Sequence, residues 1–228
     1  MTAILQRTIS AGVRAHLSNL LSQQVEPLLS SDDLTLLAEL VRKADGKVEE
    51  IQQEEQRILA NRDMSDLGKA KALAEMAERA LADFGFLGVV LSRTERDIAD
   101  LEHRLYAPFF VPKDENPTMR LIRELRAGEI RSAHEGGNHA ALFIQALERD
   151  DLETTLAFLT APGGRWVNDD VIQRGKLAYA KRTNETGYAK GQSLARLREH
   201  LTGIALFIAK WLTGLGANPD KVQQALSL

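Results

Sequence analysis

The sequence predicts an all-α protein, in which a long antiparallel helical hairpin and an N-terminal helix precede a C-terminal bundle of shorter helices. Hydrophobic residues make up 44% of the chain and aromatic residues only 5%. The apolar set is mostly Leu, Ala, Ile and Val, and few segments are rich in β-branched residues, which favours helices over strands. Apolar side chains also recur at intervals of three and four residues, the period of packed helices. Capping residues mark where these stretches begin and end.

A heptad seam predicts the first arm of the hairpin, over residues 34–62. Ser31, Asp32 and Asp33 precede the seam and provide an N-cap and acidic residues for the first turn. Glu55 occupies one seam position. The apolar seam residues are Leu34, Leu37, Val41, Ala44, Val48, Ile51 and Ile58.

Residues 66–106 show the same spacing and form the predicted second arm, with Asp63 or Ser65 as its cap. Two glycines in the stretch "FGFLG" (84–88) interrupt the pattern, so the sequence does not decide between one helix and two. Residues 3–29 are expected to form a further helix packed on the hairpin. The apolar face of the second arm includes Leu67, Leu73, Met76, Ala77, Ala80, Leu81, Phe84, Leu87, Leu91, Ile98, Leu101 and Leu105.

A proline-rich connector is predicted between two domains. Pro108, Pro112 and Pro117 exclude a continuous helix, whereas Phe109 and Phe110 are too apolar for a free linker. We therefore expect a hairpin domain over residues 1–106, a connector over 107–117 and a helical bundle over 118–228.

The second half carries clear helix-start signals. Asn116 and Asn218 each precede a proline, the pattern of an N-cap followed by the first helical residue, and Asn168 can cap another helix. Asp150 with Glu153 resembles a capping box, and a last long helix is expected over about residues 186–212. The first of these helices has an expected packing face of Met119, Leu121, Ile122, Leu125 and Ile130.

Composition excludes several classes of site. The chain has no cysteine, so it has no disulfide, thiolate metal site or cysteine nucleophile. Its net charge of -3 argues against coating of nucleic acid by the whole chain. Residues 201–216 are apolar but shorter than the about 20 residues that span a bilayer. The N-terminus lacks the apolar core of a secretory signal, so we expect no membrane contact and a location in the cytoplasm, or in a virion.

The stretch "HEGGNH" places His134, Glu135 and His139 within six residues, which raises the question of a zinc hydrolase. That motif requires two histidines four residues apart on one helix, whereas these are five apart and separated by Gly136 and Gly137. The alternative is a helix–loop–helix junction, in which one glycine ends a helix and Asn138 caps the next. A loop could still join the two histidines, but no third ligand with matching spacing is visible. We therefore expect no metal, no cofactor and no catalytic residues.

A basic segment offers a second hypothesis. Residues 174–198 contain one acidic residue, Glu185, and two tyrosines, Tyr179 and Tyr188, which could stack on bases while basic side chains contact phosphates. The alternative is a solvated helix pair whose cations face water or pair with acidic residues. The candidate nucleic-acid-binding residues are Arg174, Lys176, Lys181, Arg182, Lys190, Arg196 and Arg198.

Residues 128–163 combine an Ile130-Arg131 pair, a short Ala/Leu helix, the acidic pair Asp150-Asp151 and a second short helix ending at Ala161-Pro162. This pattern resembles small, uncharacterised helical proteins of tailed bacteriophages and prophages. The resemblance covers about 35 residues of a Leu/Ala-rich pattern and carries no catalytic residues. It implies a role in a virion, in assembly or in host interaction.

Together these patterns favour a non-enzymatic interaction or assembly protein. Two helices bury only a seam between them, so further apolar faces need a third helix or a partner chain. We expect a homo-oligomer or a complex with other protein subunits, with nucleic-acid association as the alternative. The expected partner-binding residues are Leu36, Leu40, Leu59, Phe109 and Phe110.

Overall fold

The computed structural model describes residues 15, 29–109, 115–159 and 166–228. Over this part the protein is helical and contains no strand, which confirms the all-α prediction. None of the described helices combines the length and apolar composition needed to cross a bilayer. The elements are α2 (Ser31–Ala60), α3 (Asp66–Leu105), the 3-10 turn η1 (Ala107–Phe109), α4 (Pro117–Ala133), α5 (His139–Glu148), α6 (Leu152–Leu159), α7 (Asp169–Thr183), α8 (Glu185–Gly214) and α9 (Pro219–Leu226).

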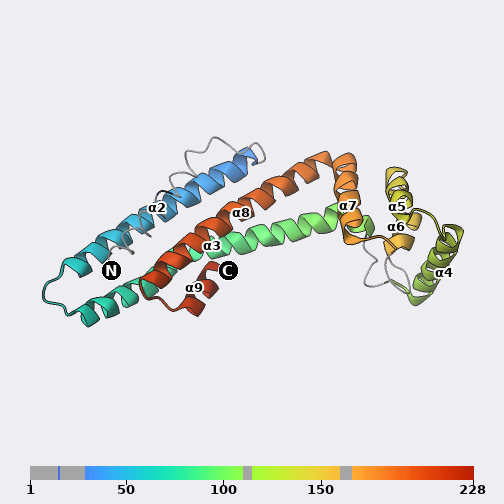
Figure 1. The fold of residues 1–228 in the computed structure, drawn as a ribbon. Coiled ribbons are helices and arrows are strands. Elements are labelled where there is room, and N and C mark those ends of the chain that lie inside the picture. Colours follow the sequence, from blue (N-terminus) through green and yellow to red (C-terminus); the bar gives the residue numbers. More distant parts are fainter. Residues whose placement is uncertain (1–14, 16–28, 110–114, 160–165) are drawn as a thin grey trace. The chain divides into compact units, whose positions relative to one another are not determined.

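The predicted hairpin is formed by α2 and α3, which run antiparallel from the turn that joins them (Figure 1). The Ser65 side chain accepts a hydrogen bond from the Gly68 amide (3.1 Å) and so caps α3. The heptad seam is buried from Leu37 to Ile51 and includes Glu55, which is 4% exposed. Leu67 departs from the prediction because it is 82% exposed. The predicted N-terminal helix, residues 3–29, lies almost entirely outside the described residues.

The glycines of "FGFLG" do not break α3, which continues from Asp66 to Leu105. Gly88 is needed for packing instead. A Cβ there would lie 2.5 Å from the Ala225 carbonyl oxygen and 3.2 Å from the Leu226 carbonyl carbon. The missing side chain therefore lets the end of α9 lie directly against α3.

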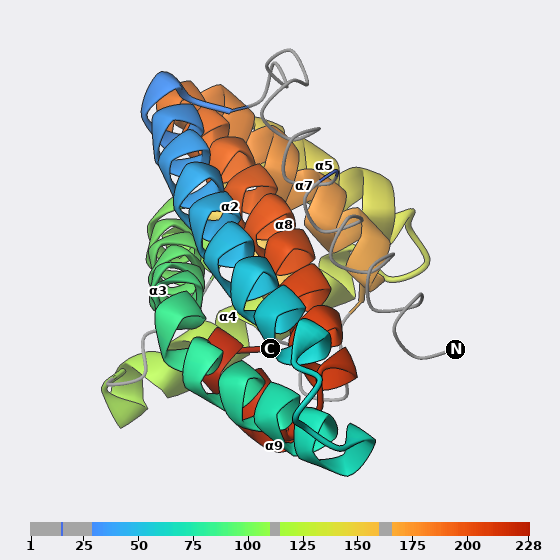
Figure 2. The same cartoon turned by 90° about the vertical axis from the view of Figure 1, so that its left-hand side faces the viewer.

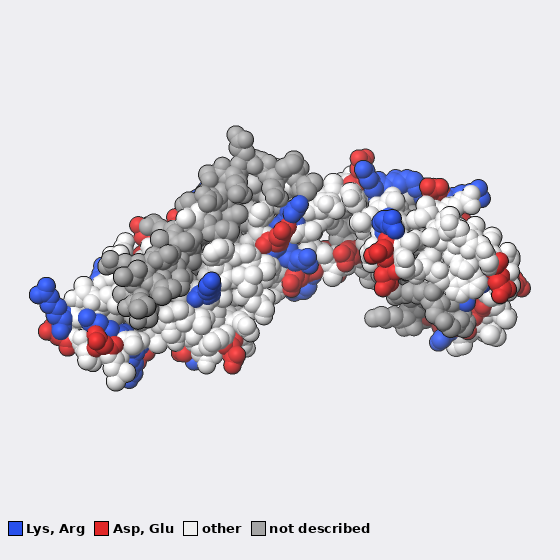
Figure 3. Space-filling view, viewed as in Figure 1, with Lys and Arg blue, Asp and Glu red and all other residues white. Residues whose placement is uncertain are grey.

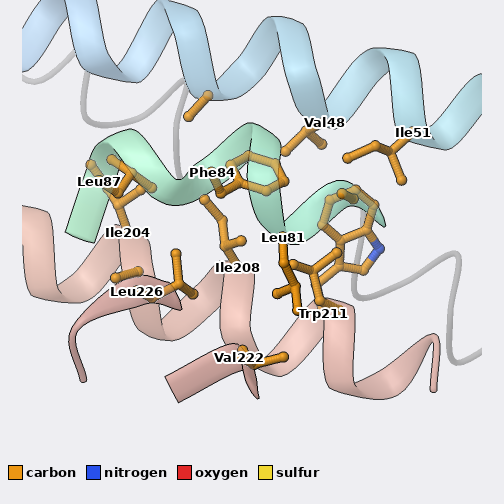
Figure 4. Close-up of a cluster of buried hydrophobic side chains, with 14 of the residues drawn as sticks. Val48, Ile51, Leu81, Phe84, Leu87, Ile204, Ile208, Trp211, Val222 and Leu226 are labelled. Atoms are coloured by element: carbon orange, nitrogen blue, oxygen red, sulfur yellow. The ribbon is translucent and has the colours of Figure 1, made fainter. Parts of the chain in front are cut away.

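The chain divides into two compact units, residues 1–98 with 192–228 and residues 99–191. This division differs from the predicted domains of 1–106 and 118–228, because α8 and α9 return to the hairpin. Their side chains, such as Ile204, Ile208 and Trp211, share one core with Val48 and Phe84 (Figure 4). Figures 1 and 2 both show α8 beside α2. A three-helix core forms because the hairpin leaves an apolar face that α8 covers.

The second unit has its own core, which gathers around Phe143 and Phe158, each fully buried. Helix α6 contacts α4, α5 and η1, and α5 also contacts α7. Phe109 from η1 is 6% exposed and packs edge-on against Tyr106 and Tyr179. Phe109, predicted to bind a partner, is therefore covered by side chains of its own unit instead, whereas Phe110 lies outside the described residues.

Asparagine caps begin four helices as the sequence predicts. Asn138 accepts a hydrogen bond from the Ala141 amide, and Asn116, Asn168 and Asn218 cap α4, α7 and α9 in the same way. Two predicted caps are displaced by one residue. Ser30 caps α2 in place of Ser31.

At α6 the side chain of Asp151, not Asp150, accepts the hydrogen bond from the Thr154 amide (3.0 Å). Asp150 adopts a left-handed backbone conformation with a φ of 57°. The one-residue shift arises because Asp150 ends the turn after α5 and pairs with Arg182 (2.7 Å).

Candidate functional site

The leucines predicted to bind a partner are instead covered by the chain's own helices. Leu40 is 7% exposed and belongs to the core of the first unit, and Leu36 and Leu59 are half-buried and pack against that core. The sequence analysis assumed that the hairpin would leave these side chains uncovered. Leu40 is therefore not available as a docking surface, and Leu36 and Leu59 are only partly exposed.

An exposed apolar face lies elsewhere, on α4 in the second unit. Met119, Leu121, Ile122 and Leu125 are 58%, 57%, 48% and 62% exposed. The sequence analysis interpreted these residues as a packing face, and this interpretation is wrong. The side of α4 that is buried in the unit presents Ala127 and Arg131.

A stripe of exposed residues runs along one side of α4 and is called the outer face of α4. The size and polarity of its side chains change along the helix. Its N-terminal half carries large apolar side chains, with Ile122 beside the stripe, whereas Met119 lies about 120° from Leu125 around the helix. Its C-terminal half carries small residues, and a Cβ added at Gly128 would meet no atom within 4 Å. At 3.6 residues per turn the stripe is formed by the exposed residues Thr118, Leu121, Leu125, Gly128 and Ser132.

The charged border of this face is held by local ion pairs. Arg120 pairs with Glu124 within α4 (3.0 Å), and Arg126 pairs with Glu153 at the start of α6 (3.6 Å). Figure 3 shows acidic and basic side chains interspersed over the described surface in view, without a large area of one sign. Apolar contact, and not net charge, therefore dominates what this face can bind.

The "HEGGNH" stretch forms the predicted helix–loop–helix junction. Helix α4 ends at Ala133 with His134 as its C-cap, Gly136 has a φ of 79° in the turn that follows, and Asn138 caps α5. His139 stacks on Trp166 with 4.4 Å between ring centroids, and its Nε2 lies 3.3 Å from the His134 carbonyl oxygen. Among the described residues no three His, Cys, Asp or Glu side chains cluster in a way that could hold a metal ion.

The seven candidate nucleic-acid-binding residues are divided between the two units. Arg174, Lys176, Lys181, Arg182 and Lys190 belong to the second unit, whereas Arg196 and Arg198 belong to the first.

Four of these residues contact groups within their own unit. Arg182 binds the Asp150 carboxylate through both terminal nitrogens (2.7 and 3.2 Å), and this ion pair lowers the pKa of Asp150. Arg196 pairs with Glu199 (2.7 Å), the Arg174 Nε donates to the Asp170 carbonyl oxygen (3.3 Å), and the Lys176 ammonium lies over the Tyr106 ring.

An open groove between α5 and α7 encloses about 600 Å³. Its lining is mostly apolar, with Ala141, Ile144 and Val171, and Glu148 and Arg174 are its charged residues. One cation and one anion on an open apolar wall do not indicate a particular ligand or reaction, so the groove adds no catalytic candidate.

No family model, curated protein or solved structure matches this chain. The resemblance of residues 128–163 to phage proteins therefore stays a prediction. The site must be judged from its own geometry, and the outer face of α4 is the largest group of exposed apolar side chains on one described helix.

Proposed function

We propose that this protein is a non-enzymatic assembly protein that pairs with a second copy of itself through the outer face of α4. The observation that carries the proposal is the exposure of Leu121, Ile122 and Leu125 along one side of α4, in line with small residues. Exposed apolar patches of this kind commonly mark sites of protein association. The resemblance to small phage proteins adds a virion or assembly setting to the proposal.

Self-pairing is favoured because the two halves of the outer face complement each other. In an antiparallel arrangement with a two-fold axis near Leu125, Leu121 of one copy lies over Gly128 of the other. Thr118 then lies opposite Ser132. The same patch can serve both copies, as a two-fold interface requires, and Gly128 allows close approach because nothing in its own unit fills the space beside it.

Sedimentation equilibrium of the full chain tests whether the pairing occurs. We expect a monomer–dimer equilibrium in the micromolar range, because one helix face buries less surface than a standard interface of about 1,600 Å². A chain that stays monomeric up to about 200 µM, where a Kd in the micromolar range predicts mostly dimer, would contradict the proposal.

Gly128→Gln tests the close approach with a matched control. Glutamine is a better helix former than glycine, so the variant should stabilise α4 while blocking the space that Leu121 of the second copy needs. Gly46→Gln in α2 is the control, since a Cβ at Gly46 also meets no atom within 4 Å. We expect weaker dimerisation for Gly128→Gln alone; equal dimer affinities would exclude close packing at Gly128.

Disulfide trapping tests whether the two α4 helices of the dimer run antiparallel. Because the chain has no native cysteine, only the introduced cysteines can form a disulfide. A mixture of Thr118→Cys and Ser132→Cys chains should cross-link to a heterodimer, because antiparallel helices bring these positions within the about 7 Å Cα distance a disulfide allows. Thr118→Cys alone should not cross-link to itself. The opposite pattern would indicate a parallel pair and would exclude the two-fold arrangement proposed here.

A further inference from the structure

Arg131 in α4 is a buried cation whose side chain has unused hydrogen-bond donors. It is 7% exposed, and its Nε and Nη2 atoms have no hydrogen-bond partner in the described structure. Burial alone lowers the pKa of this guanidinium. Buried polar atoms in native proteins are normally hydrogen-bonded, and an unsatisfied one calls for an explanation, of which an ion or ligand is one.

The two unused nitrogens form the edge of the guanidinium that recognises an oxyanion with two parallel hydrogen bonds. Arg123, two turns earlier in the same helix, uses the same edge of its guanidinium to bind a carboxylate. Its Nε and Nη2 donate to Oε1 and Oε2 of Glu115, both at 3.0 Å. In Arg131 the same edge is presented without a carboxylate among the described residues.

Arg131 lies beside a cluster of aromatic and imidazole rings, which it contacts through Trp166. The Arg131 guanidinium lies over the Trp166 ring, 5.6 Å from its centroid, and Trp166 stacks in turn on His139. His139 is the first residue of α5, whose N-terminal end carries a partial positive charge. His134 and His139 both lie beside Phe158, with centroid distances of 6.3 and 5.8 Å.

We infer that Arg131 is the anchor of a binding site for a small oxyanion, a carboxylate or phosphate group, held by the Nε–Nη2 edge. Trp166, His134 and His139 are only half-buried, so the cluster reaches the surface of the unit. The site lies on the buried side of α4 and is independent of the dimer face proposed above.

Fluorescence of the full chain provides a direct test, because the protein has only two tryptophans. In a Trp211→Phe background, Trp166 is the sole tryptophan and contacts the proposed site. Inorganic phosphate and acetate are titrated separately against chloride at matched ionic strength, with calorimetry as a second readout. We expect a saturable change in Trp166 emission with phosphate or acetate and none with chloride.

Variants assign the signal to Arg131. Arg131→Gln should weaken the binding at least tenfold, and Arg131→Lys should also weaken it, because lysine keeps the charge and loses the two-pronged edge. Arg120→Gln, at a 68% exposed arginine of the same helix, should bind as the parent does. If Arg131→Gln does not fold, the titrations of Arg131→Lys and of the parent protein decide whether Arg131 binds the anion.

The outcomes separate the ligand classes. Tighter binding of phosphate assigns a phosphate-bearing ligand, and tighter binding of acetate assigns a carboxylate-bearing one. No saturable signal in either readout up to about 50 mM, a range in which even a millimolar Kd would be saturated, overturns the inference. Equal binding by the Arg131 and Arg120 variants overturns it as well.

Discussion

Leu125→Ala should weaken dimerisation far more than it affects folding. Leu125 is 62% exposed in the single chain, so the substitution leaves no large cavity in the monomer. Burial of a fully exposed leucine side chain contributes about 1.5–3 kcal/mol, so the exposed part is worth about 1–2 kcal/mol per copy. The two-fold axis places this residue in the interface twice, which gives about 2–3 kcal/mol after allowing for the methyl group that alanine retains.

That free energy corresponds to a dimer dissociation constant raised about 30-fold to 150-fold. Sedimentation equilibrium at several concentrations measures this change, and circular dichroism reports whether the helices persist. Leu67→Ala is the matched control, because Leu67 is 82% exposed on α3 and outside the outer face of α4. Equal dissociation constants for the two variants would refute the assignment of the interface.

The remaining predictions concern stability and pH. Phe84→Ala should lower the free energy of unfolding by about 3–5 kcal/mol in urea titrations, because Phe84 is fully buried; a loss below about 1 kcal/mol would contradict the core described here. Gly46→Ala should raise the free energy of unfolding by up to about 1 kcal/mol through helix propensity alone, and a destabilised variant would show that the glycine is required. Arg123 lowers the pKa of Glu115, so this ion pair stabilises the fold above the ordinary glutamate pKa and loses its effect as the pH falls through the lowered value. Glu115→Gln should therefore reduce the melting temperature near neutral pH and converge with the parent as the pH falls below the lowered pKa of Glu115, and a difference that grows in acid would reverse the assigned sign.

Local signals in the sequence were sufficient for the helices and most of their ends. An asparagine followed by a helical stretch identified the starts of α4, α5, α7 and α9, because an N-cap acts through hydrogen bonds within three residues. The cap of α6 was misplaced by one residue, since Asp150 and Asp151 are both competent and only the path of the turn distinguishes them.

The candidate site was not predictable in the same way. The apolar residues of α4 have the same spacing as a core helix, and the sequence analysis therefore assigned them to packing. The one local indication against this assignment is that Ala127 and Arg131, the buried residues of α4, lie on another side of the helix. Whether Arg131 would be buried depends on Trp166, 35 positions further along the chain.

The sequence by itself determined the all-α class, the hairpin seam and the capping of most helices, because helical period and N-cap hydrogen bonds act between near neighbours. Only the tertiary structure decided which apolar stripes are covered. Leu40 is buried in a core that gathers side chains of α2, α3, α8 and α9, whereas Leu125, at equivalent spacing, is not covered by any described helix. Burial depends on contacts between distant segments, and side chains of the same kind and spacing end up in the core or in solvent according to those contacts.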